Sequence, residues 1–367
     1  MTNLVVLLGC LVLASLAASA RARADVRRGA GAALLALLLI APLLSDTTSI
    51  LFDALTAMCI AYGWNVIGGY TGYASFGNVA YLGLGAFVAA GFMSRQPGHL
   101  ALPWFVAIPL AVGIVSVVAL AVGLAVLRLR GHYFSIATLG VAIAMPELIN
   151  WDFAFGPDGV VPNFFGGGRP LNFPLVPDAQ LGGLALGADR YLFYYLGLLT
   201  AVVGFSATLL LSRSKLGYAL VAIRENEDAA EALGINTTAM KSLAYVLSAA
   251  LAALGGAVVG YKLTNMTTEA DALFSITNNL QMIVITLIGG PGSIWGPAIG
   301  AFILFAIQEG LRSVSNSSLF LEWQAAVFSL LIIVVVLFLP RGLMEFLRGR
   351  ERFTWRRLLR NLTANRV

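Results

Sequence analysis

Long apolar runs separated by short polar stretches dominate the pattern along the chain. Several runs approach or exceed the roughly 20 residues that a helix needs to cross a hydrocarbon core. The expected spans lie at about 3–20, 30–45, 50–69, 103–127, 133–150, 191–211, 242–262, 294–311 and 322–340, with another between residues 69 and 103. We therefore expect an all-α fold, a polytopic transmembrane helical bundle of about 10–11 spans.

A charged run from Ser212 to Lys241 is enclosed by apolar sequence on both sides. Leu216, Leu220 and Ile223 share one helical face, at spacings of four and three residues. Ala230 and Leu233 continue the apolar stripe, which predicts one or two short amphipathic helices outside the bilayer.

The same run carries signals for helix ends. Asn226 can cap a second helix, with Glu227 and Asp228 at its positive end, and Gly234 can supply a left-handed exit. An ordinary solvated loop is the alternative, but a mere connector does not need about thirty residues of capped helix. The pattern favours a docking element for a soluble partner.

Two glycine-rich stretches interrupt the apolar pattern, one in each half of the chain. The first spans residues 68–78 and includes Gly72 and Gly77, and the second spans 289–297 and includes Gly290, Gly292 and Gly296. Such stretches are too rich in glycine for an uninterrupted helix. They indicate either close helix packing through small residues or irregular backbone beside a transport path, and both can hold.

The positions of the charged residues indicate the membrane topology of the chain, and they do not point to a charged ligand. Only 11% of the 367 residues are charged, and the net charge of +5 comes from arginines beside the spans, so no nucleic-acid partner is expected. The basic clusters at 21–28, 128–130 and 341–366 are predicted to be cytoplasmic, as is the charged run, with the N-terminus outside. Cys10 and Cys59 lie in apolar sequence and predict inert core thiols.

The expected organisation has three parts. Residues 1–48 form N-terminal spans, residues 49–345 form the core of the bundle, and residues 346–367 form a basic cytoplasmic tail. Within the core, residues 151–190 are predicted to be an external loop and residues 212–242 a cytoplasmic coupling loop.

Several motifs together resemble the inner-membrane permease subunits of bacterial ABC importers for branched-chain amino acids, of the Liv type. They are GYASFGN at 72–78, LRLRGHYF at 127–134, GPDG at 156–159, RENEDAAEALGI at 224–235 and GGPGSIWGP at 289–297. The resemblance covers about residues 50–345.

The resemblance implies that the segment matching 224–235 docks into a groove on a cytoplasmic ATPase. The coupling residues that it implies are Arg224, Glu227, Asp228, Ala230, Glu231, Leu233 and Gly234. Glu227 and Glu231 would reach donors on that partner, and Ala230 and Leu233 would supply apolar contact. The implied partners are a second homologous permease, two ATPase subunits, an extracytoplasmic substrate-binding protein and membrane lipid.

ATP chemistry is expected to reside in those partners. The sequence contains no GxxxxGK[ST] motif, so we expect no cofactor on this chain and no enzymatic activity of its own, with ATP and Mg²⁺ used by partner subunits. A membrane-embedded enzyme is disfavoured because no His/Asp/Glu cluster or Ser–His pair lies within the expected spans.

An amino-acid zwitterion can be matched by helix ends and bare glycine backbone without a buried ion. The candidates for the substrate path are Ser75, Asn78, Tyr81, Thr138 and Ser293, and each could equally form an interhelical hydrogen bond. The same architecture could carry urea, short amides or other amino acids. A stand-alone secondary transporter would need a mid-span ion relay, whereas Asp53, Glu147 and Glu309 all lie near expected span ends.

Overall fold

The structure is a computed structural model of the chain. It describes residues 2–19, 24–44, 48–94, 100–150, 171–172, 180–181, 184–185, 188–263, 265–266, 273–314 and 342–344. The predicted span at 322–340, the tail at 346–367 and most of the loop at 151–190 lie outside the described residues. The division into parts at 1–48, 49–345 and 346–367 stays a prediction.

The all-α prediction is confirmed. The membrane-length apolar helices among the described residues are six, at Ala24–Leu44, Ser49–Tyr70, Trp104–Val126, His132–Ile149, Tyr191–Arg213 and Thr237–Leu263. In the part of the chain that the structure describes, the strands form two antiparallel two-residue pairs: β1 (Leu171–Asn172) with β4 (Asn265–Met266), and β2 (Gln180–Leu181) with β3 (Leu184–Ala185). The total of 10–11 spans stays a prediction, since one of them falls outside the described residues.

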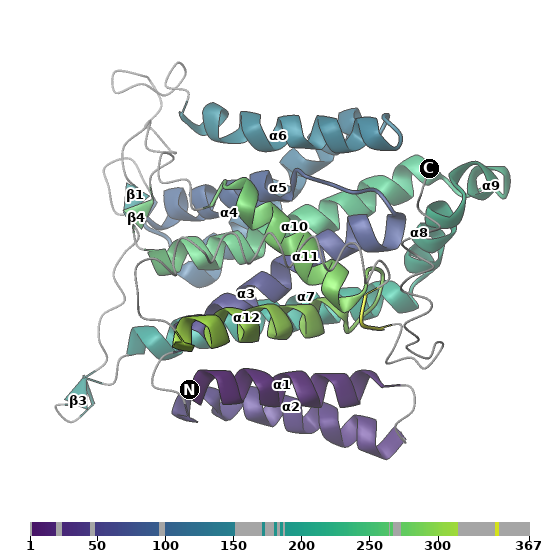
Figure 1. Ribbon diagram of the computed structural model, residues 1–367. Coiled ribbons are helices and arrows are strands. Elements are labelled where there is room, and N and C mark those ends of the chain that lie inside the picture. The colour runs from purple at the N-terminus through teal and green to yellow at the C-terminus, as the bar shows by residue number, and fades with distance from the viewer. Residues whose placement is uncertain are drawn as a thin grey trace, which may run out of the picture. The chain divides into compact units, whose positions relative to one another are not determined.

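The chain folds into two compact units, Leu55–Met282 and the remainder, Met1–Ala54 with Ile283–Val367. In the second of these, α1 (Thr2–Ala18) and α2 (Ala24–Leu44) lie side by side, and α1 also contacts α12 (Gly296–Val314) (Figure 1). The Nδ2 of Asn3 donates to the Oε1 of Glu309 at 3.5 Å, which joins α1 to α12. Two further helices, α3 (Ser49–Trp64) and α11 (Ile276–Gly289), run from one unit into the other.

In the unit Leu55–Met282, α10 (Thr237–Leu263) is the central helix. It packs against α4 (Asn78–Met93), α5 (Trp104–Val126) and α7 (Ala188–Arg213), while α6 (His132–Asn150) packs on α4 and α5 (Figure 1). Two short helices, α8 (Lys215–Glu225) and α9 (Glu227–Ala232), connect α7 to α10.

Glycines bring α4 and α10 into backbone contact. A Cβ at Gly256 would lie 2.0 Å from the carbonyl oxygen of Leu82, and one at Gly85 would lie 2.5 Å from that of Ala253. No side chain fits at such distances, so these positions require glycine. The close-packing interpretation of the first glycine-rich stretch is therefore confirmed for its continuation into α4.

The first stretch also breaks the helix, as predicted. After α3 the chain makes a π-helical turn, η1 (Asn65–Tyr70), and then runs without regular structure from Gly72 to Gly77 before α4 begins. Gly72 has φ +76°, a left-handed conformation that favours glycine. We call residues 68–78 the first knot and residues 289–297 the second knot.

Candidate functional site

The charged run forms two capped helices, as predicted. The Oγ of Ser214 accepts from the N–H of Gly217 at 3.1 Å and caps α8, and the Oδ1 of Asn226 accepts from the N–H of Ala229 at 3.0 Å and caps α9. Gly234 ends α9 with φ +85°. Local capping residues therefore define this segment, which we call the handle (residues 214–236).

The handle has an inward and an outward face. Leu220, Ile223 and Ala230 are buried, whereas Leu233 is 84% exposed. The prediction that Leu233 continues the apolar stripe with Ala230 is therefore wrong, because α9 ends at Ala232 and the following turn directs Leu233 away from the bundle. Leu233 is an apolar side chain presented to the surroundings.

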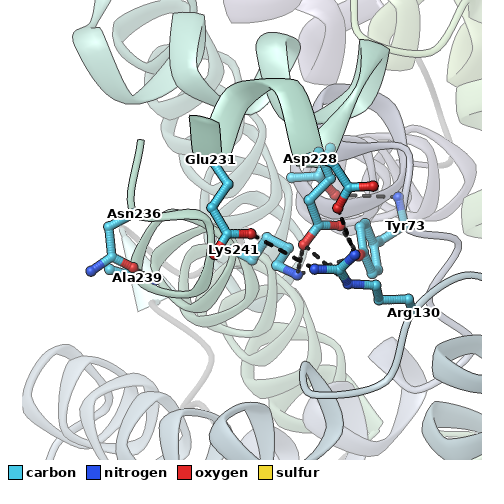
Figure 2. Close-up of polar contacts among 9 residues, drawn as sticks. Tyr73, Arg130, Asp228, Glu231, Asn236, Ala239 and Lys241 are labelled. Carbon is cyan, nitrogen blue, oxygen red and sulfur yellow. Dashed lines mark hydrogen bonds and ion pairs between the residues drawn. The ribbon is translucent and has the colours of Figure 1, made fainter. Parts of the chain in front are cut away.

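Glu227 lies at the centre of a charged cluster on the inward side of α9. The Nζ of Lys241 donates to its Oε1 at 2.5 Å, and the hydroxyl of Tyr73 donates to its Oε2. The same Nζ lies 3.3 Å from the Tyr73 hydroxyl and 4.8 Å from the centroid of its ring. Figure 2 shows Lys241 and Tyr73 converging below α9.

This geometry gives Glu227 partners within its own chain, and its expected contact with a partner subunit stays a prediction. Its side chain is only 14% exposed, and Lys241, which holds it, is 3% exposed. Both carboxylate oxygens already accept hydrogen bonds from this chain. Asp228 and Glu231, at 80% and 62% exposure, are the acidic side chains that α9 presents outward, and Glu225 at the end of α8 is 72% exposed.

Arg130 joins the outward acidic side chains to the turn between α5 and α6. Its Nη1 donates to the Oδ1 of Asp228 at 2.8 Å, and its Nη2 lies 3.8 Å from the Oε2 of Glu231 (Figure 2). The basic turn at 128–130 and the handle therefore lie at the same end of this unit, as the predicted topology requires. These exposed pairs contribute little stability individually.

The surroundings of Glu227 shift its proton affinity. Burial alone would raise its pKa, but the hydrogen bonds from Lys241 and Tyr73 and the charges of Lys241 and Arg130 outweigh burial and hold the pKa below its usual value. Burial, followed by the hydrogen bond to Glu227, raises the pKa of the Tyr73 phenol. The cluster therefore keeps Glu227 ionised and Tyr73 protonated, so that the phenol donates to the carboxylate.

A second contact joins the handle to the first knot. The Nη1 of Arg224 donates to the carbonyl oxygen of Gly69 at 2.8 Å, which lies in the π-helical turn. A Cβ at Gly72 would lie 3.0 Å from the Cγ of Arg224, so Gly72 leaves room for this arginine stem. The predicted coupling residues Arg224 and Glu227 thus both bind this chain's own knot.

Four of the five candidates for the substrate path gather around the first knot and are buried. The Nδ2 of Asn78 donates to the Oγ of Ser248 at 2.8 Å, and its Oδ1 accepts from the Oγ of Ser75 at 2.9 Å. The hydroxyls of Tyr81 and Tyr245 lie 3.0 Å apart. Asn78 and Tyr81 thus form interhelical hydrogen bonds between α4 and α10, and their role in a path stays a prediction.

Thr138 and its neighbours hold the knot against α6. The Oγ1 of Thr138 accepts from the N–H of Phe76 at 3.1 Å, and the Oγ of Ser135 donates to the carbonyl oxygen of Ala74 at 2.7 Å. A Cβ at Gly77 would lie 2.9 Å from the carbonyl oxygen of Thr138. Thr138 therefore stabilises the irregular backbone of the knot, and whether substrate also reaches it stays a prediction.

The second knot, in the other unit, also requires glycine. Gly290 and Gly292 have φ values of +118° and +71°, and the Oγ of Ser293 donates to the carbonyl oxygen of Gly290 at 2.6 Å. A Cβ at Gly296 would lie 2.4 Å from the same carbonyl oxygen. Ser293 is 3% exposed and closes this turn, and a contact with substrate stays a prediction.

Sequence reasoning missed Tyr73, Arg130 and Lys241 as members of the cluster. Lys241 carried the clearest signal, because a lysine at the start of a membrane-length apolar helix needs a counter-charge, and Glu227 lies fourteen positions before it. Among the described residues, no group of three or more His, Cys, Asp or Glu side chains could hold a metal ion.

Membrane-length apolar helices, together with a charged helical segment between two of them, define a multi-pass membrane protein. A family model described as the branched-chain amino acid transport system permease component matches residues 47–336. The chain therefore belongs to this family of membrane permease components of ABC transporters.

Relatives support the same family. The chain is 29% identical to the high-affinity branched-chain amino acid transport system permease protein LivM of Salmonella typhimurium, over 86% of this chain and 75% of that protein. It is 27% identical to LivM of Escherichia coli K12, over 79% and 68%, and 30% identical to E. coli K12 LivH, over 40% and 45%. No solved structure matches the chain.

Proposed function

We propose that this chain is the transmembrane permease subunit of a binding-protein-dependent ABC importer that carries branched-chain amino acids across the bacterial inner membrane. The family and the printed names of the relatives support the cargo. In this proposal two cytoplasmic ATPase subunits hydrolyse ATP with Mg²⁺, a second homologous permease completes the bundle, and a substrate-binding protein delivers solute from outside.

The handle is the observation that carries this proposal. It is a capped pair of helices that exposes Asp228, Glu231 and Leu233 and binds the first knot through Arg224 and Glu227. An element with an outward docking face and an inward attachment can convert closure of a motor subunit into rigid-body movement of the bundle. In this proposal the handle and the C-terminal tail face the cytoplasm.

Uptake by the reconstituted complex tests the function and its cargo. Vesicles containing this chain and its companion subunits should accumulate leucine, isoleucine and valine only when ATP and the binding protein are both supplied. Leucine uptake should be outcompeted by isoleucine but not by urea or short amides, because an apolar side chain and a zwitterion are recognised together.

Two controls complete the measurement. A companion ATPase that binds but cannot hydrolyse ATP should abolish accumulation. Preferential uptake of urea, amides or another class of amino acid would contradict the cargo, and uphill transport by this chain alone would contradict the architecture.

A further inference from the structure

The attachment of the handle is asymmetric in a way that docking alone does not explain. Its outward acidic residues are exposed, yet Glu227 is turned inward onto Lys241 of α10 and Tyr73 of the first knot. Arg224 binds Gly69 on the other side of Gly72. The handle therefore holds the first knot at two points, four residues apart along the chain.

Burial makes the Glu227 attachment difficult to release. Lys241 is 3% exposed, and an unpaired charge at such a position is strongly unfavourable. If α9 moved away while the knot stayed in place, Lys241 would lose its counter-charge and the hydroxyl of Tyr73 its acceptor, and only the 3.3 Å contact between these two groups would remain. Movement of α9 together with Tyr73 and the start of α10 keeps every one of these contacts.

Aromatic rings extend this attachment into the bundle. Tyr73 packs edge-to-face on Phe134 with centroids 5.1 Å apart, and Phe134 packs on Tyr245 at 6.2 Å. Tyr245 in turn packs on Tyr81 at 5.7 Å and shares a hydroxyl contact with it. An unbroken set of contacts thus runs from the handle to the seam between α4 and α10.

We propose that Tyr73 and Lys241 are positioning residues that transmit movement of the handle to the first knot and the α4–α10 pair, so that ATP hydrolysis is coupled to solute passage. This inference rests on the proposed function and assigns the transmitting contacts within it. Tyr73 carries the movement into the knot, and Lys241 keeps Glu227 locked against α10.

The test measures ATP hydrolysed per leucine transported, in complexes reconstituted in phospholipid vesicles. Tyr73→Phe keeps the ring on Phe134 and removes only the hydroxyl, and this ratio should rise about fivefold, the factor that corresponds to one net hydrogen bond. The matched control is Tyr133→Phe, at a tyrosine that is 74% exposed, and its ratio should equal that of the wild type.

A double variant separates transmission from folding. Lys241→Met alone should lower thermal stability, because Glu227 loses its counter-charge, whereas Glu227→Gln with Lys241→Met should regain most of that stability. The ratio of ATP to leucine should stay raised in the double variant. Recovery of the ratio together with stability would overturn the inference, since the cluster would then serve folding only.

The remaining outcomes distinguish this inference from the proposed function. If the wild-type complex transports leucine and Tyr73→Phe leaves the ratio unchanged, the inference is overturned and the proposed function stands. If the wild-type complex transports no solute at all, the proposed function is contradicted and the inference with it.

Discussion

Lys241 is a charged side chain almost sealed from solvent at the start of an apolar helix. Its Nζ has two partners on separate elements, the carboxylate of Glu227 on α9 and the hydroxyl of Tyr73 in the first knot. A compact ammonium with rotatable donors suits such a three-way contact better than the planar guanidinium of arginine. The residue fixes where α9 meets the bundle.

Acidification should weaken this contact. The pKa of Glu227 in the folded chain lies below that of an unfolded glutamate, about 4.3. Its ionised form therefore stabilises the fold above about pH 4.3, and this contribution is lost as the pH falls through the lower, folded-state pKa. Thermal unfolding of the purified chain at several pH values should show a loss of stability in that acidic window that Glu227→Gln lacks.

The control for this titration is Glu225→Gln, which neutralises a neighbouring glutamate that is 72% exposed. It should follow the wild type across the acidic range. Parallel pH profiles for the wild type and Glu227→Gln would show that the carboxylate makes no difference to stability and would contradict the geometry described here.

At the scale of elements, the handle was predictable because its signals are local. Asn226 and Gly234 act on backbone groups within a few residues, so the sequence pattern alone places both ends of α9. The partners of Glu227 were not predictable in the same way. Tyr73 lies 154 positions from Glu227 in the sequence. Its hydrogen bond to the Glu227 carboxylate depends on how the first knot packs against α10, which no local pattern reveals.

The exposed face of the handle should contribute to the free energy of binding an ATPase subunit. Leu233 is 84% exposed and makes little contribution to the fold. If it is buried against an ATPase subunit, Leu233→Ser should weaken binding of that subunit by about tenfold to a hundredfold, since burying a leucine contributes about 1.5–3 kcal/mol. Co-purification or a titration of the ATPase against this chain in detergent measures the change.

A conservative variant gives the comparison. Leu233→Met keeps an apolar side chain of similar size and should bind the ATPase as the wild type does, and neither variant should change thermal stability. Equal binding by Leu233→Ser and the wild type would show that docking uses another surface.

At the scale of the whole molecule, the class and most helices followed from the sequence, because apolar runs of membrane length have few alternatives. Which helices pack against one another did not follow from the sequence. Nothing local in Gly85 or Gly256 identifies which backbone each one meets, and the pairing of α4 with α10 depends on the complete unit. Asn78 and Tyr81 were therefore read as path candidates, whereas the structure also gives them interhelical partners.

Cysteine labelling should establish the orientation of the chain. The natural Cys10 and Cys59 are buried and should give a low background. Tyr133→Cys and Tyr218→Cys, at side chains that are 74% and 69% exposed, should react with a membrane-impermeant maleimide only after the cytoplasmic side is opened. Asp158→Cys, in the stretch predicted to be external, should react in intact cells. The reverse pattern would invert the proposed topology.

The backbone contact between α4 and α10 limits how this unit can flex. Side chains at a helix interface can change rotamer to absorb a small displacement, but at Gly85 and Gly256 carbonyl groups meet bare backbone and no such adjustment exists. The two helices must therefore move together as one rigid body. A displacement of the start of α10, where Lys241 holds the handle, is therefore carried along the pair to both of these glycine positions.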